Sequence, residues 1–151
     1  RSSISDLVCK GIQPKYYFIS ASGNKKKFSS KLQKLLNDSE DKTSKNKKLQ
    51  INLALNYGSK EEILNAVKIT KQKKQKINEK NIEDNLYTSG IPNPDLLIRT
   101  GNTQRLSNFL LWQLAYTEIF FEKKLWPDFN KKDYKKVLTK FKNLKRNFGA
   151  I

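Results

Sequence analysis

The 151-residue sequence predicts an α/β domain with a largely parallel sheet flanked by helices. Two observations support this fold class. Short apolar runs alternate with amphipathic segments along the chain, in the order strand then helix, four times over. The run LLIRT at 96–100 is almost continuously apolar, which is typical of a parallel strand buried on both faces. We find no internal repeat, and the length suits one domain.

The first part of the chain is expected to hold two strands and a helix. Residues 15–22 form a short apolar run between a proline and a glycine, which indicates a strand. Apolar residues then recur at helical spacing over 27–38, and the polar residues 39–48 are expected to form a loop. Residues 49–57 alternate between apolar and other residues, the pattern of a second strand.

The next helix is expected to begin at Ser59, because Ser59 and Glu62 match the capping-box pattern. It is expected to end in the lysine-rich segment 68–76, and a short helical segment follows at 79–88. The residues expected to face inward are Ile63, Leu64 and Val67.

The last part of the chain should contain the remaining two strands and two helices. The strands are predicted at 96–100 and 117–121, with a helix between them from Ser107 to Tyr116. Asn130 is expected to cap the closing helix. One stripe of that helix is apolar: Tyr134, Val137, Leu138, Phe141, Leu144 and Phe148.

The composition excludes several kinds of protein. No apolar run is long enough for a transmembrane helix, and the single Cys9 with no histidine makes a disulfide framework or a zinc site untenable. The net charge of +17 favours polyanionic partners. The excess is mostly lysine accompanied by asparagine. A drift of the composition toward AT-rich codons, which we call compositional drift, is therefore an alternative explanation of the charge. The five lysines of 68–76 likewise form either a solvated helix end or a contact with headgroups or nucleic acid.

The polar residues after the third strand suggest a ligand site. Ligands of open α/β sheets bind beyond the carboxyl ends of the strands, where Arg99 and the segment 56–58 are expected to lie. Arg105 follows in the next loop, and Ser107 would open a helix. Two guanidinium groups, a hydroxyl and helix amides suit an anion with several oxygens, such as a diphosphate.

Other roles for these residues are also open. Arg99 could pair with a core carboxylate, and Ser107 could be only a helix cap. The apolar stretch 109–116 could be core, dimer interface or ligand wall. Glu118 lies in an apolar strand, where a carboxylate needs a cation, either an arginine or a metal such as Mg²⁺.

The stretch PDLLIRTGNTQRLSNFLLWQLAYTEIFF, followed by LWPDF, resembles the C-terminal signature of the cis-prenyltransferases. INLALNYGSKEEILNAV is similar to the family's segment ending in N-Y-G-G-R, so the resemblance runs from about residue 15 to the end. It implies an enzyme that joins isopentenyl diphosphate to an allylic diphosphate with cis geometry and requires Mg²⁺. The product would be a long polyprenyl diphosphate.

The resemblance also implies roles for single residues. Arg99, Arg105, Leu106 and Ser107 match the residues that bind isopentenyl diphosphate, and Glu118 matches a carboxylate that helps to hold Mg²⁺. Stretch 109–121 matches a region that lies partly at a dimer interface in the family, which implies a homodimer. A long lipid product further implies peripheral membrane association, at a cytoplasmic or membrane-surface location.

The sequence departs from the family pattern in three places. Asn102 and Thr103 stand where the family usually has Gly-Glu, and N-Y-G-G-R has become Asn-Tyr-Gly-Ser-Lys at 56–60. The family's N-terminal D-G-N-R motif, which carries the Asp expected to act in catalysis, is not found. We therefore expect residues 1–151 to be the C-terminal part of one prenyltransferase domain, whose fold is incomplete, with no catalytic residue of its own and no turnover alone.

Two other functions are compatible with the sequence. A non-catalytic partner subunit of a two-component cis-prenyltransferase would share the fold, although such subunits tend to lose the substrate arginines that are present here. A basic nucleic-acid-binding module would explain the charge. No recognised nucleic-acid-binding motif appears, and the basic residues are dispersed, so we expect no nucleic-acid partner.

Overall fold

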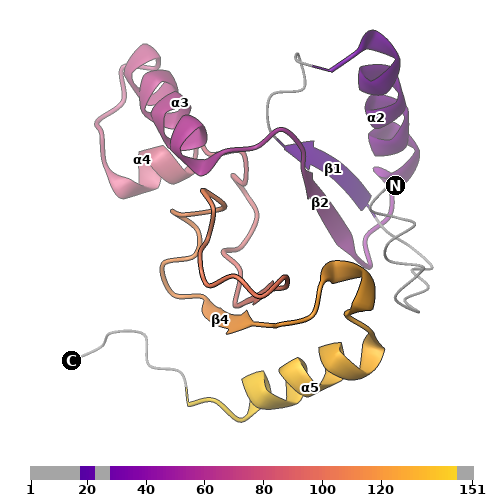
Figure 1. Ribbon diagram of the computed structural model, residues 1–151. Coiled ribbons are helices and arrows are strands. Elements are labelled where there is room, and N and C mark those ends of the chain that lie inside the picture. The colour runs from indigo at the N-terminus through magenta and orange to yellow at the C-terminus, as the bar shows by residue number, and fades with distance from the viewer. Residues whose placement is uncertain (1–17, 23–27, 146–151) are drawn as a thin grey trace. The chain divides into compact units, whose positions relative to one another are not determined.

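A computed structural model describes residues 18–22 and 28–145 (Figure 1). These residues form two compact units. We call the first the β1–β2 unit, which holds the described residues up to 92 together with 108–110. We call the second the β3–β4 unit, which holds 93–107 and 111–145.

The β1–β2 unit contains a parallel strand pair. β1 (Phe18–Ser22) pairs with β2 (Gln50–Ala54) in a register that runs from Phe18 opposite Gln50 to Ser22 opposite Ala54. The helix between them, α2 (Ser30–Thr43), packs beside β1 (Figure 1). Both predicted strands are confirmed over these residues, and 15–17 lie outside the described part. The predicted alternation is also confirmed, because Ile51 and Leu53 are half-buried between exposed neighbours.

Helix α2 is longer than predicted and begins later. Ser29 caps it by accepting a hydrogen bond from the Leu32 N–H (3.3 Å). The helix then continues to Thr43, into the predicted loop 39–48. The hydroxyls of Ser39 and Thr43 donate to carbonyls one turn earlier, at 2.7 Å each. Polar residues bonded in this way are compatible with a helix, and the segment contains no glycine or proline to end it.

Helix α3 (Ser59–Gln72) packs against the short α4 (Glu79–Glu83), which lies within the predicted segment 79–88. The inward face of α3 was predicted wrongly. Leu64 is 71% exposed, and Ile63 and Val67 are only half-buried. The buried residues are small or polar: Ser59, Glu62, Ala66 and Thr70. Thr70 explains part of the difference, because its hydroxyl accepts a hydrogen bond from the Asn85 side-chain N–H (3.1 Å). The Asn85 side-chain oxygen in turn accepts a hydrogen bond from the Lys73 ammonium (2.6 Å).

The predicted capping box at Ser59 is also wrong. Gly58 is the N-cap, and Ser59 is already the first helical residue. Asn108 caps α3 instead, although it is about fifty residues away along the chain. Its backbone carbonyl accepts from the Ser59 N–H (2.8 Å), and its side-chain Oδ1 accepts from the Lys60 N–H (2.9 Å).

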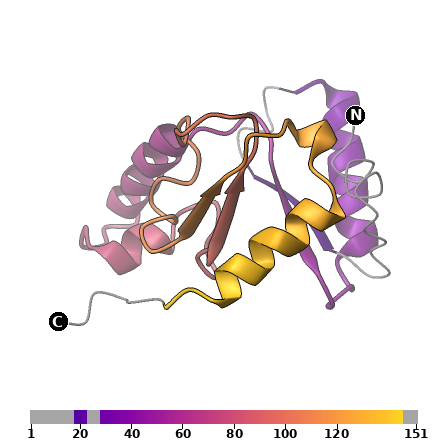
Figure 2. The same ribbon diagram turned by 60° about the horizontal axis from the view of Figure 1, so that its bottom comes forward.

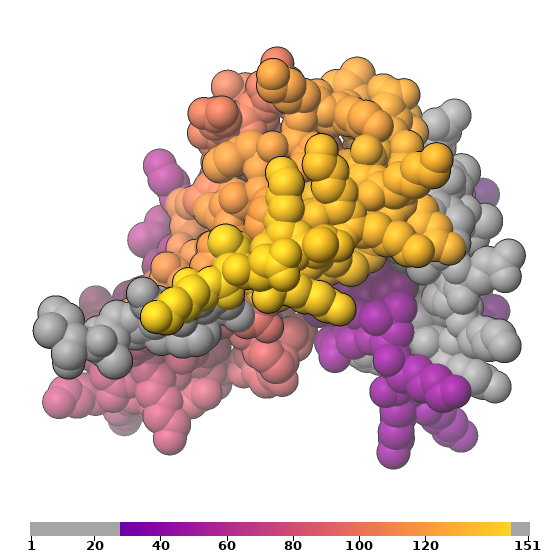
Figure 3. All heavy atoms as spheres, turned by 90° about the horizontal axis from the view of Figure 1, so that it is seen from below, coloured from indigo at the N-terminus to yellow at the C-terminus, as the bar shows by residue number. Residues whose placement is uncertain are grey.

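The β3–β4 unit contains a second parallel pair. β3 (Leu96–Arg99) pairs with β4 (Glu118–Phe121), with Leu96 opposite Glu118 and Arg99 opposite Phe121. Both predicted strands are therefore confirmed, as is parallel pairing in each unit. The 3₁₀ turn η2 (Trp126–Asp128) leads into α5 (Lys131–Lys142), seen beside the strand pair in Figure 2 and at the surface in Figure 3. Asn130 caps α5 as predicted, and Asp133 completes a capping box. The predicted Phe148 lies outside the described residues.

The helix predicted from Ser107 to Tyr116 does not form. Turns occupy this segment, and Ser107, Asn108 and Leu110 have positive φ angles of 50°, 63° and 45°. A right-handed helix cannot contain residues in this left-handed region. Among the described residues, no helix has the length and apolar character needed to cross a bilayer.

Candidate functional site

The residues predicted to bind an anion lie on the segment that follows β3. Arg99 is the last residue of β3 and is paired with Phe121, so it lies at the carboxyl edge of the β3–β4 pair. Its side chain is half-buried. The Arg99 Nε–H donates a hydrogen bond to the Thr103 hydroxyl oxygen at 3.2 Å. The guanidinium is therefore held by the loop that comes directly after its own strand.

That loop is itself fixed to the end of β4 by backbone hydrogen bonds. The Glu122 N–H donates to the Arg99 carbonyl (2.8 Å), the Gly101 N–H to the Lys124 carbonyl (2.8 Å) and the Asn102 N–H to the Glu122 carbonyl (3.2 Å). Gly101 and Asn102 have φ angles of 93° and 54°. This left-handed turn directs the chain so that the Thr103 side chain meets Arg99.

Arg99 and Arg105 have no acidic partner in the part of the chain that the structure describes. The alternative in which Arg99 pairs with a core carboxylate is thus not seen among these residues. Arg105 is exposed, and no described residue forms a hydrogen bond with its side chain. Leu106 is half-buried and Ser107 is exposed. Since no helix starts at Ser107, helix amides do not contribute to an anion site here.

Glu118 lies at the other end of the strand pair. It is the first residue of β4 and is opposite Leu96, three residues from the register position of Arg99. Three residues of strand span about 10 Å, so the structure does not bring Glu118 to Arg99. Glu118 is half-buried. The described residues include no cluster of three His, Cys, Asp or Glu side chains that could hold a metal.

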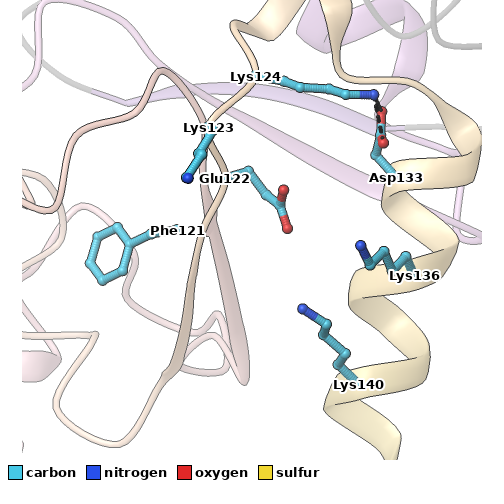
Figure 4. Close-up of a pocket in the computed structure, with 7 residues that line it drawn as sticks. All are labelled: Phe121, Glu122, Lys123, Lys124, Asp133, Lys136 and Lys140. Carbon is cyan, nitrogen blue, oxygen red and sulfur yellow. Dashed lines mark hydrogen bonds and ion pairs between the residues drawn. The ribbon is translucent and has the colours of Figure 1, made fainter.

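A basic recess of about 360 Å³ lies between the end of β4 and α5 (Figure 4). It is lined by Phe121, Glu122, Lys123, Lys124, Asp133, Lys136 and Lys140. Lys124 forms an ion pair with Asp133 at 2.8 Å, and this hydrogen bond lowers the pKa of the Asp133 carboxyl. The Glu122 side chain points toward α5, from which Lys136 and Lys140 project (Figure 4). Sequence reasoning missed the recess, although lysines at i and i+4 of a helix are a visible signal.

A second polar cluster, in the β1–β2 unit, was also missed. Glu62 is fully buried. Its carboxylate accepts hydrogen bonds from the Tyr57 hydroxyl and from the Tyr87 N–H (2.8 Å). Burial raises the pKa of the Tyr57 phenol, and the hydrogen bond to Glu62 raises it further. The Phe109 ring packs edge-on against Tyr57 at 5.8 Å. We interpret this cluster as structural, because it fixes the segment between β2 and α3. The expectation that the segment 56–58 lies at the same sheet edge as Arg99 stays a prediction.

Comparison with known proteins identifies the family. Residues 5–149 match the family model described as "Putative undecaprenyl diphosphate synthase". An isoprenyl transferase from Aquifex pyrophilus is 43% identical over 85% of this chain and 56% of its own length. A ditrans,polycis-undecaprenyl-diphosphate synthase of Legionella pneumophila, specific for (2E,6E)-farnesyl diphosphate, is 41% identical over 100% of this chain and 64% of its own length.

Solved structures agree with this result. A probable undecaprenyl diphosphate synthase from Campylobacter jejuni superimposes with a TM-score of 0.80 and 38% identity, over 88% of this chain and 63% of that one. Lavandulyl diphosphate synthase from Lavandula x intermedia, in complex with dimethylallyl diphosphate, superimposes with a TM-score of 0.84 and 32% identity. That match covers 99% of this chain and 73% of the other chain. The chain spans about half the length of the first curated relatives that it matches. It belongs to the undecaprenyl diphosphate synthase family of cis-prenyltransferases.

Proposed function

We propose that the protein condenses isopentenyl diphosphate onto an allylic diphosphate with cis geometry and makes a long polyprenyl diphosphate. This chain would supply the isopentenyl diphosphate site. Family membership supports the reaction class. The observation that carries the assignment of the site is the Arg99 guanidinium, fixed at a strand end with no acidic partner among the described residues.

In this proposal the chain's own residues act by binding and orientation. Arg99 and Arg105 present guanidinium forks that match the oxygens of a diphosphate, and Ser107 adds a hydroxyl. Leu106 would contact the substrate between them. Binding isopentenyl diphosphate by its diphosphate would lower the activation barrier mainly by holding this reactant in the right position and orientation. The positive charges also stabilise negative charge on the phosphate oxygens.

The proposed reaction includes Mg²⁺. This cation commonly binds through one or two carboxylates together with substrate phosphates, so Glu118 fits the part of a single carboxylate ligand. When bound, Mg²⁺ would neutralise charge on a diphosphate.

We propose the partners as follows. The substrates are isopentenyl and allylic diphosphates, and the assembly is a homodimer that uses part of 109–121. The lysine-rich face of α5 would support peripheral association with a membrane. The 151-residue chain alone is expected to give no turnover, and prenyl transfer by this polypeptide alone would contradict that expectation.

The test of the site assignment is Arg99→Ala in the full-length protein. Loss of bidentate, charged hydrogen bonds costs about 2–3 kcal/mol. The KM for isopentenyl diphosphate should therefore rise on the order of a hundredfold. The KM for the allylic substrate, measured in the same assays, is the internal control and should change far less. Equal changes in both KM values would contradict the assignment.

A further inference from the structure

We propose that Thr103 is a positioning residue for Arg99, and that its hydroxyl sets the direction in which the guanidinium meets the diphosphate. This inference rests on the proposed function. It concerns a residue that stands where the family pattern usually has a glutamate. The Arg99–Thr103 hydrogen bond of 3.2 Å carries it.

The geometry of the bond is suited to this role. An arginine side chain has five N–H donors, one on Nε and four on the two terminal nitrogens. Thr103 accepts from Nε. Both terminal nitrogens therefore remain available for the parallel pair of hydrogen bonds by which arginine binds phosphate. A contact at either terminal nitrogen would instead compete with the anion.

The lack of charge on the Thr103 hydroxyl matters as much as its position. A hydroxyl is neutral, so it orients Arg99 without cancelling its positive charge. No carboxylate among the described residues pairs with Arg99. The full charge of the guanidinium is thus retained for the substrate anion.

Thr103 can hold Arg99 because its own position is fixed. The loop bonds from Gly101 to Lys124 and from Asn102 to Glu122 tie the residues before Thr103 to the end of β4. The Thr103 side chain is half-buried, which limits competition from water. The hydroxyl is therefore a preorganised acceptor, and little freedom is lost when the substrate binds.

The experiment compares Thr103→Val with Thr103→Ser in the full-length protein. Valine keeps the shape and removes the hydroxyl, whereas serine keeps the hydroxyl. We expect Thr103→Val to raise the KM for isopentenyl diphosphate about five- to tenfold, with little change in the KM for the allylic diphosphate. Thr103→Ser should restore a KM close to that of the wild type. Thr139→Val, which removes an exposed hydroxyl on α5, is the matched control and should change neither KM.

Each outcome decides the proposal. A wild-type KM in Thr103→Val overturns it, as does a serine variant as impaired as the valine variant. If thermal melting shows that Thr103→Val is unfolded, Thr103→Ala and Thr103→Ser are compared in its place by the same criterion. If Arg99→Ala leaves the KM for isopentenyl diphosphate unchanged, the proposed function fails. If Arg99→Ala raises that KM but Thr103→Val does not, only the role of Thr103 fails.

Discussion

Gly58 and Asn108 approach each other so closely that a larger residue at position 58 would have to displace the Asn108 side chain. A Cβ atom built on Gly58 would lie 2.9 Å from the side-chain nitrogen of Asn108. The φ angle of Gly58 is −148°, so its backbone conformation is open to any residue, and the close approach to Asn108 is what favours glycine. Asn108 cannot move away at low cost, because its Oδ1 caps the Lys60 N–H of α3.

A double-mutant cycle tests this contact. Gly58→Ala should displace the Asn108 side chain and lose its cap, at a cost of about 1 kcal/mol in the free energy of unfolding. Asn108→Gly keeps the left-handed backbone and the carbonyl acceptor but removes the side chain. In that background, Gly58→Ala should cost much less. The measurement is chemical denaturation of the four proteins, and additive effects would show that the contact does not matter.

The departures of this sequence from the family pattern at positions 102 and 103 have local explanations. Asn102 adopts a φ angle of 54°, and asparagine tolerates this left-handed conformation better than most residues other than glycine. Topology alone predicted that Arg99 lies at a strand end. The contact with Thr103 could not be predicted, because it depends on how the loop folds back onto β4.

Asp133 connects the start of α5 to the segment that follows β4. Its carboxylate accepts from the Asn130 N–H, which completes the capping box, and from the Lys124 ammonium. The carbonyl of Lys124 in turn accepts from Gly101, in the loop that holds Arg99. One carboxylate therefore links α5 to the loop of the candidate site.

This linkage predicts a loss of stability in acid. The pKa of Asp133 is lowered from its ordinary value of 3.8, first by the Lys124 hydrogen bond. A lowered pKa in the folded state gives stability that is present above 3.8 and is lost as the pH falls through the folded-state value. Asp133→Asn should melt below the wild type at pH 6, and the difference should shrink below about pH 4. Asp128→Asn is the matched control for loss of one carboxylate. A pH-independent difference in melting temperature would contradict this account.

The elements that could be predicted are those set by local pattern. Four strands and the start of α5 follow from apolar runs and from Asn130. The helix at 107–116 could not be excluded, because its residues have ordinary helical composition. Asn108 is drawn into a left-handed conformation by a partner far away in sequence, the start of α3. The inward face of α3 was missed for a similar reason, since Thr70 and Glu62 are buried through partners outside that helix.

The segment around α5 is one of the lysine-rich stretches of the chain. Residues 123–145 hold nine lysines and only two acidic residues. Apolar side chains are exposed beside them, with Trp126 at 45% and Leu125 at 61%. Lysines next to exposed tryptophan and leucine are the combination found where proteins bind anionic membrane surfaces. This favours a role for α5 in the proposed membrane association over simple compositional drift.

Vesicle binding distinguishes these two explanations. Replacing the exposed Lys131, Lys135 and Lys142 with glutamine should weaken binding to anionic phosphatidylserine vesicles on the order of a hundredfold, because each lysine near such a surface contributes about 1 kcal/mol. The matched control replaces Lys68, Lys71 and Lys76 of α3 and the loop after it, which removes the same charge from an exposed lysine-rich segment. Binding is measured by co-sedimentation at several salt concentrations, with neutral phosphatidylcholine vesicles alongside. An equal loss in both triple variants would show that net charge alone drives binding. Compositional drift would then explain the lysines of α5 as well as those of 68–76.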